Sequence, residues 1–390
     1  MVCELTDVGA ASPYAQRTRL NGSIELYDST LRDGEQTPGV CFNPDEKEAI
    51  ARELDAVGVP IIEAGFPVVS PKEAEGVRRI VAAGLDARLV ALSRLRDEDI
   101  DVAVDCGVDG VLLFIASSDI HLEHKLRMDR EQVLEAIASK VAYARDRGLR
   151  VQFTPEDASR TDPAFLKEVL ATAERAGAER VGVADTVGIL DPAATRRLVR
   201  TAMEAVTVPV SVHLHNDLGL ATANTLAAFE EGVVAAAVTV NGIGERAGNA
   251  SLEEVAAALA VHYGYDCGID LSRLTELSEL VSRLTGIHVP SNKAVVGPNT
   301  FTHESGIHVA AVLEEPATYE PFPAELVGGR RNLVFGKHSG RKAVRHLLRK
   351  EGLAHGPDDV GRVLTLLKDV EGPLTHRELI GLARDGGTMQ

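Results

Sequence analysis

The sequence predicts an α/β fold, a closed (β/α)8 TIM barrel followed by a small α-rich linker subdomain and a helical tail. From residue 24 onward, short β-branched or apolar runs alternate with longer segments of helical period. Such alternation requires parallel strands joined by crossover helices. Eight strand–helix units in about 240 residues match the size of a closed barrel. The composition, 45% hydrophobic but only 4% aromatic, suits an aliphatic core.

The individual elements follow from the local pattern. Several helices begin with a capping residue followed by proline, as at Asn43-Pro44, Ser70-Pro71 and Asp191-Pro192. The expected helices include 44–57, 71–83, 129–147, 163–176, 191–206 and 250–262. The expected strands are 24–27, 60–63, 88–92, 110–115, 149–153, 180–184, 208–213 and 236–240.

An open, doubly wound sheet is the rival architecture. It would normally place a glycine-rich phosphate turn after the first strand, but residues 28–36 read DSTLRDGEQ, which is charged. The barrel is therefore favoured. The expected organisation is a polar N-terminal leader (1–22), the barrel (23–285), a linker subdomain (286–340) and a helical C-terminal subdomain (341–390).

Composition excludes several classes of protein. The formal net charge of −17 opposes nucleic acid and anionic membrane surfaces, and no apolar run is long enough for a membrane span. The N-terminus lacks the apolar stretch of a secretory signal. The four cysteines (Cys3, Cys41, Cys106 and Cys267) show neither CxxC nor zinc spacing. We therefore expect a cytoplasmic protein without disulfides.

Ionisable and hydrogen-bonding residues follow several of the predicted strands. In a parallel barrel the functional residues gather at the carboxyl ends of the strands. The residues found there are Arg32, Asp33 and Gln36 after the first strand, Thr154 and Glu156 at the fifth, Thr186 at the sixth, His213 and His215 at the seventh, and Asn249 after the eighth.

The pair His213-x-His215 is the sharpest of these features. Residues i and i+2 of a strand point to the same face, so the two imidazoles could hold one metal ion. Asp33, with the Asn249 side-chain oxygen as a further ligand, completes a mixed nitrogen and oxygen site suited to Mn, Zn or a similar divalent ion.

The neighbouring residues suggest an anionic substrate. Arg32 would place a fixed cation beside the metal, where it could hold a carboxylate and polarise an adjacent carbonyl. Glu156 is either a base, a group that orients one, or the cap of the next helix. Thr186 is either a ligand of a carboxylate or a structural hydroxyl. The glycine-rich segment 241–249 is either a backbone cradle for a phosphate or pantetheine chain, or a plain tight turn.

Six motifs closely resemble the 2-isopropylmalate synthase, homocitrate synthase and citramalate synthase family. They are DSTLRDGEQTPG (28–39), HLHNDLGLA (213–221), NGIGERAGN (241–249), NKAVVG (292–297), HESGIH (303–308) and GKHSGR (336–341). The resemblance implies a Claisen-type condensation of acetyl-CoA with a 2-oxo acid, dependent on Mg, Mn or Zn, followed by thioester hydrolysis.

The resemblance also implies roles for individual residues. The metal ligands would be Asp33, His213, His215 and Asn249, and the groups around the 2-oxo acid would be Arg32, Thr186 and Glu156. We also expect Gln36, Leu92 and Thr154 to bind the substrate. His308 and Tyr319 match a catalytic pair that family members supply from the neighbouring subunit, so the resemblance implies a homodimer with shared active sites. The expected base is His308, assisted by Tyr319 and Glu156.

The substrate is predicted from departures from the family pattern. Lysine-type homocitrate synthases place a histidine on the third strand and an arginine on the fifth, where this chain has Leu92 and Gln152. A partly apolar pocket favours 2-oxoisovalerate and hence 2-isopropylmalate. The open alternatives are homocitrate, citramalate and 2-phosphonomethylmalate synthases, with Arg94 or Arg96 binding a second anion. An acyl-CoA lyase is disfavoured, because hydroxymethylglutaryl-CoA lyases use a cysteine absent from 241–251.

Overall fold

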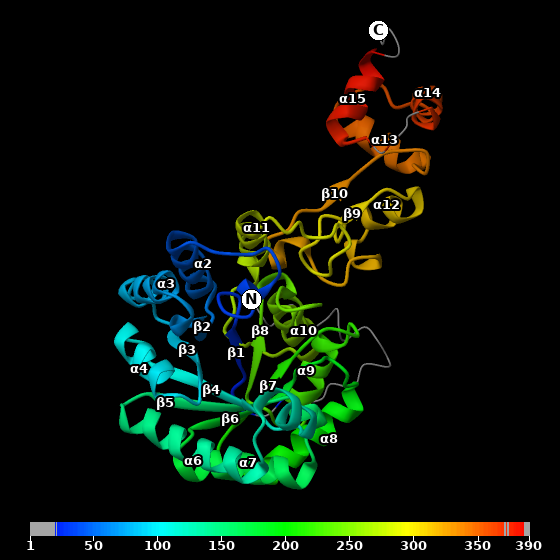
Figure 1. Cartoon of the computed structure of the whole chain (residues 1–390). Coiled ribbons are helices and arrows are strands. Elements are labelled where there is room, and N and C mark those ends of the chain that lie inside the picture. Colours follow the sequence, from blue (N-terminus) through cyan, green and yellow to red (C-terminus); the bar gives the residue numbers. More distant parts are fainter. Residues whose placement is uncertain (1–19, 21, 370–371, 373, 386–390) are drawn as a thin grey trace. The chain divides into compact units, whose positions relative to one another are not determined.

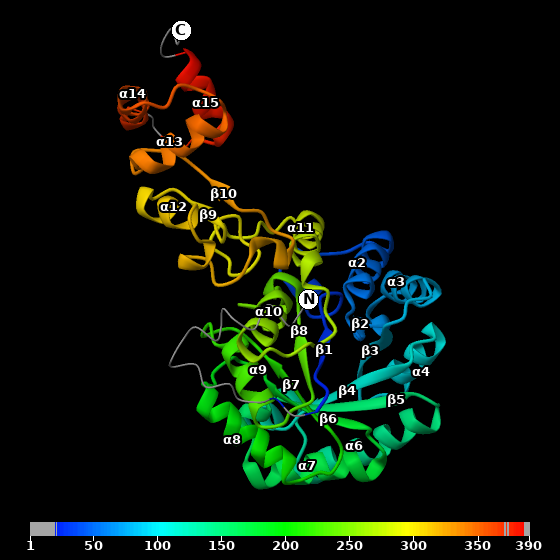
Figure 2. The ribbon, with the colours of Figure 1, turned by 180° about the vertical axis from the view of Figure 1, so that it is seen from behind.

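The predicted barrel is confirmed by a computed structural model, which describes residues 20, 22–369, 372 and 374–385. Eight parallel strands close in sequence order, since the first strand pairs with both the second and the eighth. Figures 1 and 2 show the helices arranged around the strands. The strands are β1 (Glu25–Asp28), β2 (Ile61–Gly65), β3 (Arg88–Arg94), β4 (Gly110–Ala116), β5 (Arg150–Glu156), β6 (Arg180–Asp185), β7 (Val210–Leu214) and β8 (Ala235–Val238). Most of the predicted leader lies outside the described residues.

The barrel helices begin where the capping residues predict. Asn43 and Asp129 form capping boxes, and the side chains of Ser70, Asp162 and Asp191 accept from the first turn of their helices. Each such cap stabilises its helix by about 1 kcal/mol. The helices are α2 (Pro44–Val57), α3 (Pro71–Ala82), α4 (Asp97–Cys106), α6 (Arg130–Asp146), α7 (Pro163–Ala176), α8 (Pro192–Met203), α9 (Ala221–Glu230), α10 (Leu252–Tyr263) and α11 (Leu274–Thr285).

Several details differ from the sequence-based expectations. Helices α4, α9 and α11 were not among the expected helical ranges. The apolar positions of α4 lie between many acidic residues, and α9 is mostly small residues without a strong period. Strand β8 ends at Val238, and residues 240–242 form a turn in which Asn241 has φ 62°. The strand therefore stops short of the predicted residue 240.

The interior of the barrel is filled with side chains, and its amino end carries paired charges. Tyr27, Ile61, Leu92 and Leu112 form one buried cluster with the alanines of β8. At the start of β1, Glu25 forms ion pairs with Arg88 and Arg180. A charged, paired layer thus lies at the amino ends of the strands, while functional side chains gather at the carboxyl ends.

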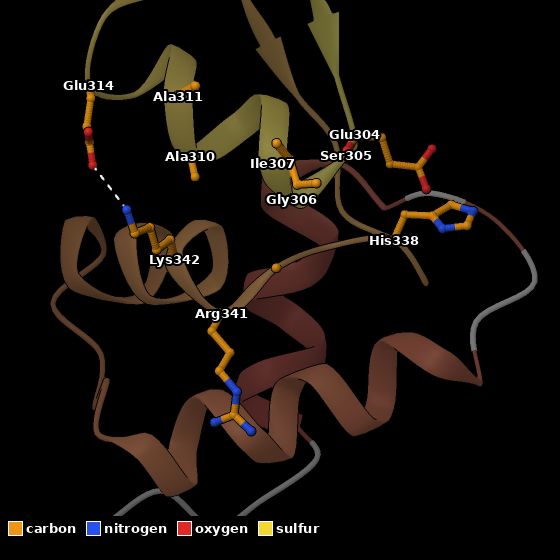
Figure 3. A pocket seen from close by; sticks show the side chains of 11 residues that line it. Glu304, Ser305, Gly306, Ile307, Ala310, Ala311, Glu314, His338, Arg341 and Lys342 are labelled. Carbon is orange, nitrogen blue, oxygen red and sulfur yellow. Dashed lines mark hydrogen bonds and ion pairs between the residues drawn. The ribbon is translucent and has the colours of Figure 1, made fainter.

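Residues 290–385, as far as they are described, form a second compact unit. Its elements are β9 (Thr302–His303), α12 (Gly306–Val312), β10 (Asn332–Leu333), α13 (Arg341–Lys350), α14 (Pro357–Lys368) and α15 (His376–Asp385). Val309 and Phe335 pack with buried residues of α13, α14 and α15 in one core. Between α12 and α13 this unit has an open hollow, across which Lys342 Nζ lies 3.3 Å from Glu314 Oε1 (Figure 3).

Among the described residues, no helix is both long and apolar enough to span a bilayer. Cys41, Cys106 and Cys267 carry free thiols, and Cys3 lies outside the described residues.

Candidate metal and substrate site

A cavity of about 410 Å³ lies at the carboxyl ends of the barrel strands. Most of the predicted site residues meet there, although they come from five different strands and the loops that follow them. Those that line the cavity are Arg32, Asp33, Gln36, Leu92, Thr154, Glu156, Thr186, His213 and His215. Asn249 is not part of the lining and lies in the loop beside His215, with which it forms an isolated bridge.

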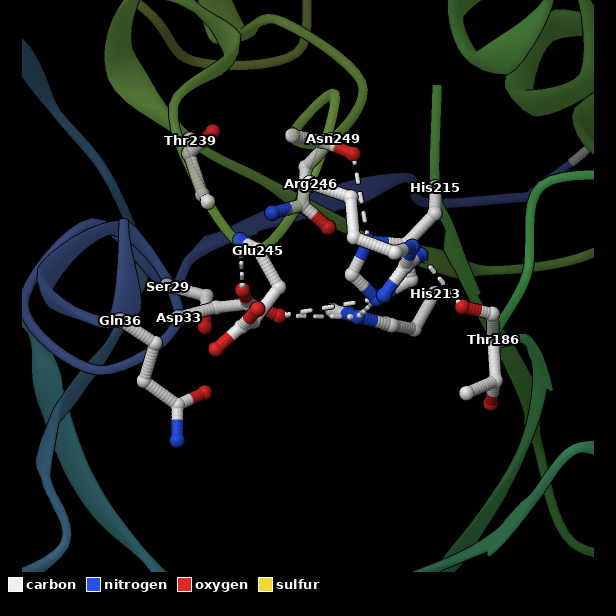
Figure 4. A network of polar contacts seen from close by, with 12 residues as sticks. Ser29, Asp33, Gln36, Thr186, His213, His215, Thr239, Glu245, Arg246 and Asn249 are labelled. Carbon is white, nitrogen blue, oxygen red and sulfur yellow. Dashed lines mark hydrogen bonds and ion pairs between the residues drawn. The ribbon is translucent and has the colours of Figure 1, made fainter. Parts of the chain in front are cut away.

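Asp33, His213 and His215 converge on one point. Asp33 Oδ2 lies 3.2 Å from His213 Nε2 and 3.8 Å from His215 Nε2, and the two Nε2 atoms are 3.1 Å apart (Figure 4). One ligand atom from each residue lies within 4.8 Å of the others. Two imidazole nitrogens and a carboxylate oxygen at this spacing form a donor set suited to a divalent ion.

The protonation states of these groups fit a metal. Burial, with the charge of His213 next, lowers the pKa of His215 to about 4. Burial alone would raise the pKa of Asp33, but the charge of Arg32 and the contacts with both histidines outweigh it, and the pKa lies well below its usual range. At neutral pH, Asp33 is therefore a carboxylate and His215 a neutral imidazole, the forms that bind metals.

Asn249 has an unused oxygen next to this cluster. Its Nδ2 donates to the carbonyl oxygen of Ile243 at 3.1 Å, whereas its buried Oδ1 has no hydrogen-bond partner among the described residues. Buried polar atoms are nearly always paired. An unpaired oxygen beside three possible ligand atoms is therefore consistent with a bound ion. Gly244 leaves this space open, since a Cβ there would lie 2.3 Å from Asn249 Nδ2 and 2.9 Å from Asp33 Oδ1.

Arg32 is held rigidly beside the ligand cluster. Its Nη1 lies 3.1 Å from Asp33 Oδ2 and its Nε lies 2.8 Å from Oε1 of Glu63. Glu63 is fully buried and also accepts from the Ser29 hydroxyl at 2.5 Å. Burial would lower the pKa of Arg32, but the charges of Glu63 and Asp33 raise it above its usual value. The guanidinium is therefore a fixed positive charge at the cavity wall.

Glu156 does not cap a helix; it binds Lys125. Both carboxylate oxygens of Glu156 lie 2.6 Å from Lys125 Nζ. Lys125 also lines the cavity and lies in a single π-helical turn, Leu122–Leu126, which ends at Arg127 with φ 55°. Irregular turns of this kind are common at functional sites. Sequence reasoning missed Lys125, because in the charged segment that follows β4 one lysine resembles any surface lysine.

Thr154 and Thr186 supply hydroxyl groups at the ends of β5 and β6. The Thr154 hydroxyl is buried without a partner among the described residues. The Thr186 hydroxyl accepts from the backbone N–H of Asp157 at 2.8 Å, which leaves its own hydrogen free to bind an anion. Arg246 donates to the Thr186 carbonyl oxygen and is held by Asp217. The two hydroxyls are thus available to a ligand.

The far wall of the cavity is apolar, and one residue expected there lies elsewhere. Leu92 lines the cavity together with Tyr27, Phe66, Leu112 and Phe114. Gln152 does not line it: its Nε2 donates to Ser211 Oγ at 3.2 Å. Thr154 and Glu156 are the side chains of β5 that line the cavity. Arg94 is likewise paired with Asp99 at 2.7 Å.

His308 and Tyr319 lie in the second unit. Their rings stack, with centroids 3.8 Å apart and planes inclined by 21°. His308 is exposed and Tyr319 is 43% exposed, so both side chains are free to meet a ligand or another surface.

Comparison with known proteins places the chain in a family. Residues 23–281 match the HMGL-like family model, and residues 295–372 match the homocitrate synthase post-HMGL domain-like model. A homocitrate synthase of Methanopyrus kandleri is 54% identical over 92% of this chain and 91% of its own length. A probable 2-isopropylmalate synthase of the same organism is 50% identical over 89% of this chain and 70% of its own.

A further relative agrees with this placement, and a solved structure shares the fold. An (R)-citramalate synthase of Methanocaldococcus jannaschii is 46% identical over 93% of this chain and 74% of its own length. The HMG-CoA lyase of Brucella melitensis has the same barrel fold, with a TM-score of 0.62 and 20% identity over 68% of this chain and 100% of that one. The chain therefore belongs to the 2-isopropylmalate synthase, homocitrate synthase and citramalate synthase family, whose barrel the HMGL-like family model describes.

Proposed function

We propose that this chain is a metal-dependent acyltransferase that condenses acetyl-CoA with a 2-oxo acid and hydrolyses the thioester to release CoA. The observation that carries the proposal is the convergence of Asp33, His213 and His215 beside the fixed charge of Arg32. A divalent ion held there, with Asn249 Oδ1 as a further ligand, would act as a Lewis acid on the ketone.

The chain's own residues hold and orient the 2-oxo acid. Arg32 lies where it can bind the ketone oxygen and stabilise the alkoxide that develops on it. The hydroxyls of Thr186 and Thr154 can donate to the carboxylate of the substrate. Gln36, exposed at the rim of the cavity, is assigned to substrate binding as well.

The proton chemistry is assigned to His308, Tyr319 and Glu156. His308 removes a proton from the acetyl methyl group, and the resulting enolate carbon forms a bond to the ketone carbon, whose oxygen becomes the alkoxide. The alkoxide takes up a proton, and water then cleaves the thioester to give a carboxylate and the CoA thiol. We further propose that His308 and Tyr319 come from the partner chain of a homodimer in the cytoplasm.

A second cavity gives a place for acetyl-CoA. It has about 280 Å³ and shares Arg32, Gln36 and Phe66 with the first cavity. Val40 and Phe42 form part of its apolar lining, and Lys72 adds a cation. Glu35, Glu73 and Lys47 also line this cavity, so it combines apolar and charged walls. The apolar part could hold the pantetheine arm, with the acetyl group delivered beside Arg32 and the 2-oxo acid.

Our first candidate substrate is 2-oxoisovalerate, which would give 2-isopropylmalate. The support is the apolar wall of Leu92, Leu112, Phe66 and Phe114, which can bury an isopropyl group. Arg94, which could have bound a second anion, is instead paired with Asp99.

A specific observation favours 2-oxoglutarate, and hence homocitrate, as the second candidate. Lys125 lines the same cavity and forms an ion pair with Glu156. The Lys125 side chain is 49% exposed, so water and ligands can compete with Glu156 for its ammonium. A distal carboxylate could replace Glu156 as its partner. The most similar relatives quoted above include a homocitrate synthase.

The test is CoA thiol release from acetyl-CoA with Mg²⁺ or Mn²⁺ and a panel of 2-oxo acids. The panel is 2-oxoisovalerate, pyruvate, 2-oxoglutarate and 3-phosphonopyruvate. We expect the highest kcat/KM with 2-oxoisovalerate; a preference for 2-oxoglutarate would select the second candidate. Release with none of them, despite bound metal, would contradict the proposed condensation.

A further inference from the structure

Lys47, on α2, is a buried charge that lines the second cavity but has no role in the chemistry proposed above. It is 1% exposed, and its ammonium has three partners. Its Nζ lies 3.1 Å from the carbonyl oxygen of Leu31, 2.7 Å from Glu35 Oε2 and 2.6 Å from Glu73 Oε1. A lysine has three donors, so all of them are used.

These partners connect two loops that border the catalytic cavity. Leu31 directly precedes Arg32, and Glu35 follows Asp33 by two residues, so the ammonium holds the loop after β1 on both sides of its functional pair. Glu73 accepts from the backbone N–H of Phe66 at 3.0 Å, in the loop after β2. Phe66 lines the cavity.

The surroundings of Lys47 leave little room for another arrangement. A Cβ at Gly65 would lie 2.1 Å from Glu73 Oε1 and 3.0 Å from Lys47 Nζ. A Cβ at Gly76 would lie 3.1 Å from Lys47 Cδ. Both glycines therefore allow the backbone to approach the buried pair closely, and the lysine stem has a defined path.

The balance of charge makes the arrangement depend on the lysine. One ammonium faces two carboxylates, whose side chains are only 19% and 14% exposed. Without the ammonium, the largely buried carboxylates of Glu35 and Glu73 would repel one another. Removing one partner of a buried ionic group leaves an uncompensated charge, which is strongly unfavourable. The loop that carries Arg32 and Asp33 would then move to separate the two carboxylates.

We propose that Lys47 is a positioning residue that fixes Asp33 and Arg32 relative to His213 and His215 by tying the β1 loop to the β2 loop. The inference rests on the proposed function, because it assumes that Asp33 binds a metal and that Arg32 binds the substrate. It goes beyond that function in assigning metal affinity and turnover to a residue that belongs neither to the metal cluster nor to the lining of the 2-oxo acid cavity.

The test compares Lys47→Met with Glu25→Gln in the full-length protein. Glu25 is a matched control, because its removal leaves Arg88 and Arg180 without their shared partner at the opposite end of the same strand. Binding of Mn²⁺ is measured by electron paramagnetic resonance of the free ion, which requires no activity. Thermal melting reports on stability, and kcat and KM report on the site.

We expect Lys47→Met to weaken Mn²⁺ binding by about 10-fold or more and to lower kcat to a similar degree, as supporting residues of metal sites do. Glu25→Gln should lower the melting temperature but leave the Mn²⁺ dissociation constant and kcat unchanged. Wild-type Mn²⁺ affinity and kcat in folded Lys47→Met would overturn the inference. An unmutated protein that neither binds Mn²⁺ nor releases CoA would instead overturn the proposed function.

Glu35→Gln keeps the inference testable if Lys47→Met does not fold. This variant retains the lysine with its Leu31 and Glu73 partners and removes only one charge. It should also weaken Mn²⁺ binding, but by less than Lys47→Met does. Unchanged Mn²⁺ affinity and kcat in folded Glu35→Gln would also count against the positioning role.

Discussion

The Nδ1 atom of His215 lies 3.2 Å from the carbonyl oxygen of Gly248. Because a carbonyl oxygen can only accept, Nδ1 carries the hydrogen and Nε2 keeps its lone pair toward Asp33 and His213. The loop after β8 therefore sets the tautomer of a residue at the end of β7. That relationship makes the histidine pair a prepared metal site, and it supports the following predictions.

Asp33→Asn should remove most of the metal affinity. The substitution keeps the size of the side chain but replaces the carboxylate that faces both histidines. We expect the Mn²⁺ dissociation constant to rise by at least about 100-fold, since even outer-shell changes cost about 10- to 100-fold. The measurement is Mn²⁺ titration by calorimetry. The control is Asp191→Asn, at the cap of α8, where asparagine caps equally well; equal affinity in both variants would remove Asp33 from the ligand set.

His308→Ala should abolish turnover while leaving metal binding intact. If the imidazole is the base that removes the methyl proton, kcat should fall by about 100- to 10,000-fold. Deuterium exchange into the methyl group of acetyl-CoA should be lost in parallel, and Mn²⁺ affinity should stay at the unmutated value. His355→Ala, at an exposed position of the same unit, is the control. A fully active His308→Ala enzyme would contradict the assignment.

Lys125→Met should reveal whether a second carboxylate is bound in the cavity. If Lys125 is the partner of a distal carboxylate, kcat/KM for 2-oxoglutarate should fall by roughly 10- to 100-fold, while the value for 2-oxoisovalerate changes much less. If kcat/KM falls equally for the two substrates, Lys125 acts through Glu156 rather than on the substrate. Lys140→Met removes an equivalent exposed pair, with Asp97 on α4, and should change neither value.

Val40→Trp should weaken the binding of acetyl-CoA but not that of the 2-oxo acid. Val40 lines the second cavity but not the first, so a larger side chain there fills the proposed passage for the pantetheine arm. We expect KM for acetyl-CoA to rise by about 5-fold or more, given the usual cost of overfilling a packed site. KM for the 2-oxo acid should be unchanged. Met203→Trp, on an exposed residue at the end of α8, is the control; equal effects of the two would argue against this passage.

The sequence predicts what depends on spacing along the chain and misses what depends on long-range pairing. The HxH pair and the acid after the first strand are placed correctly, because strand periodicity and barrel topology together determine where they point. Glu63, which holds Arg32, is one residue in a buried strand, and no local pattern marks it. The sequence also leads one to expect Gln152 at the cavity, whereas its Nε2 donates to Ser211 Oγ on β7, a contact between distant strands that no local pattern marks.

The most direct test is a titration of metal-free protein with Mn²⁺, followed by CoA thiol release from acetyl-CoA and 2-oxoisovalerate. The account predicts no release without metal, and release that rises with Mn²⁺ and saturates as the site of Asp33, His213 and His215 fills. A rate that does not depend on metal, or a fully occupied site with no release from any 2-oxo acid in the panel, would contradict it.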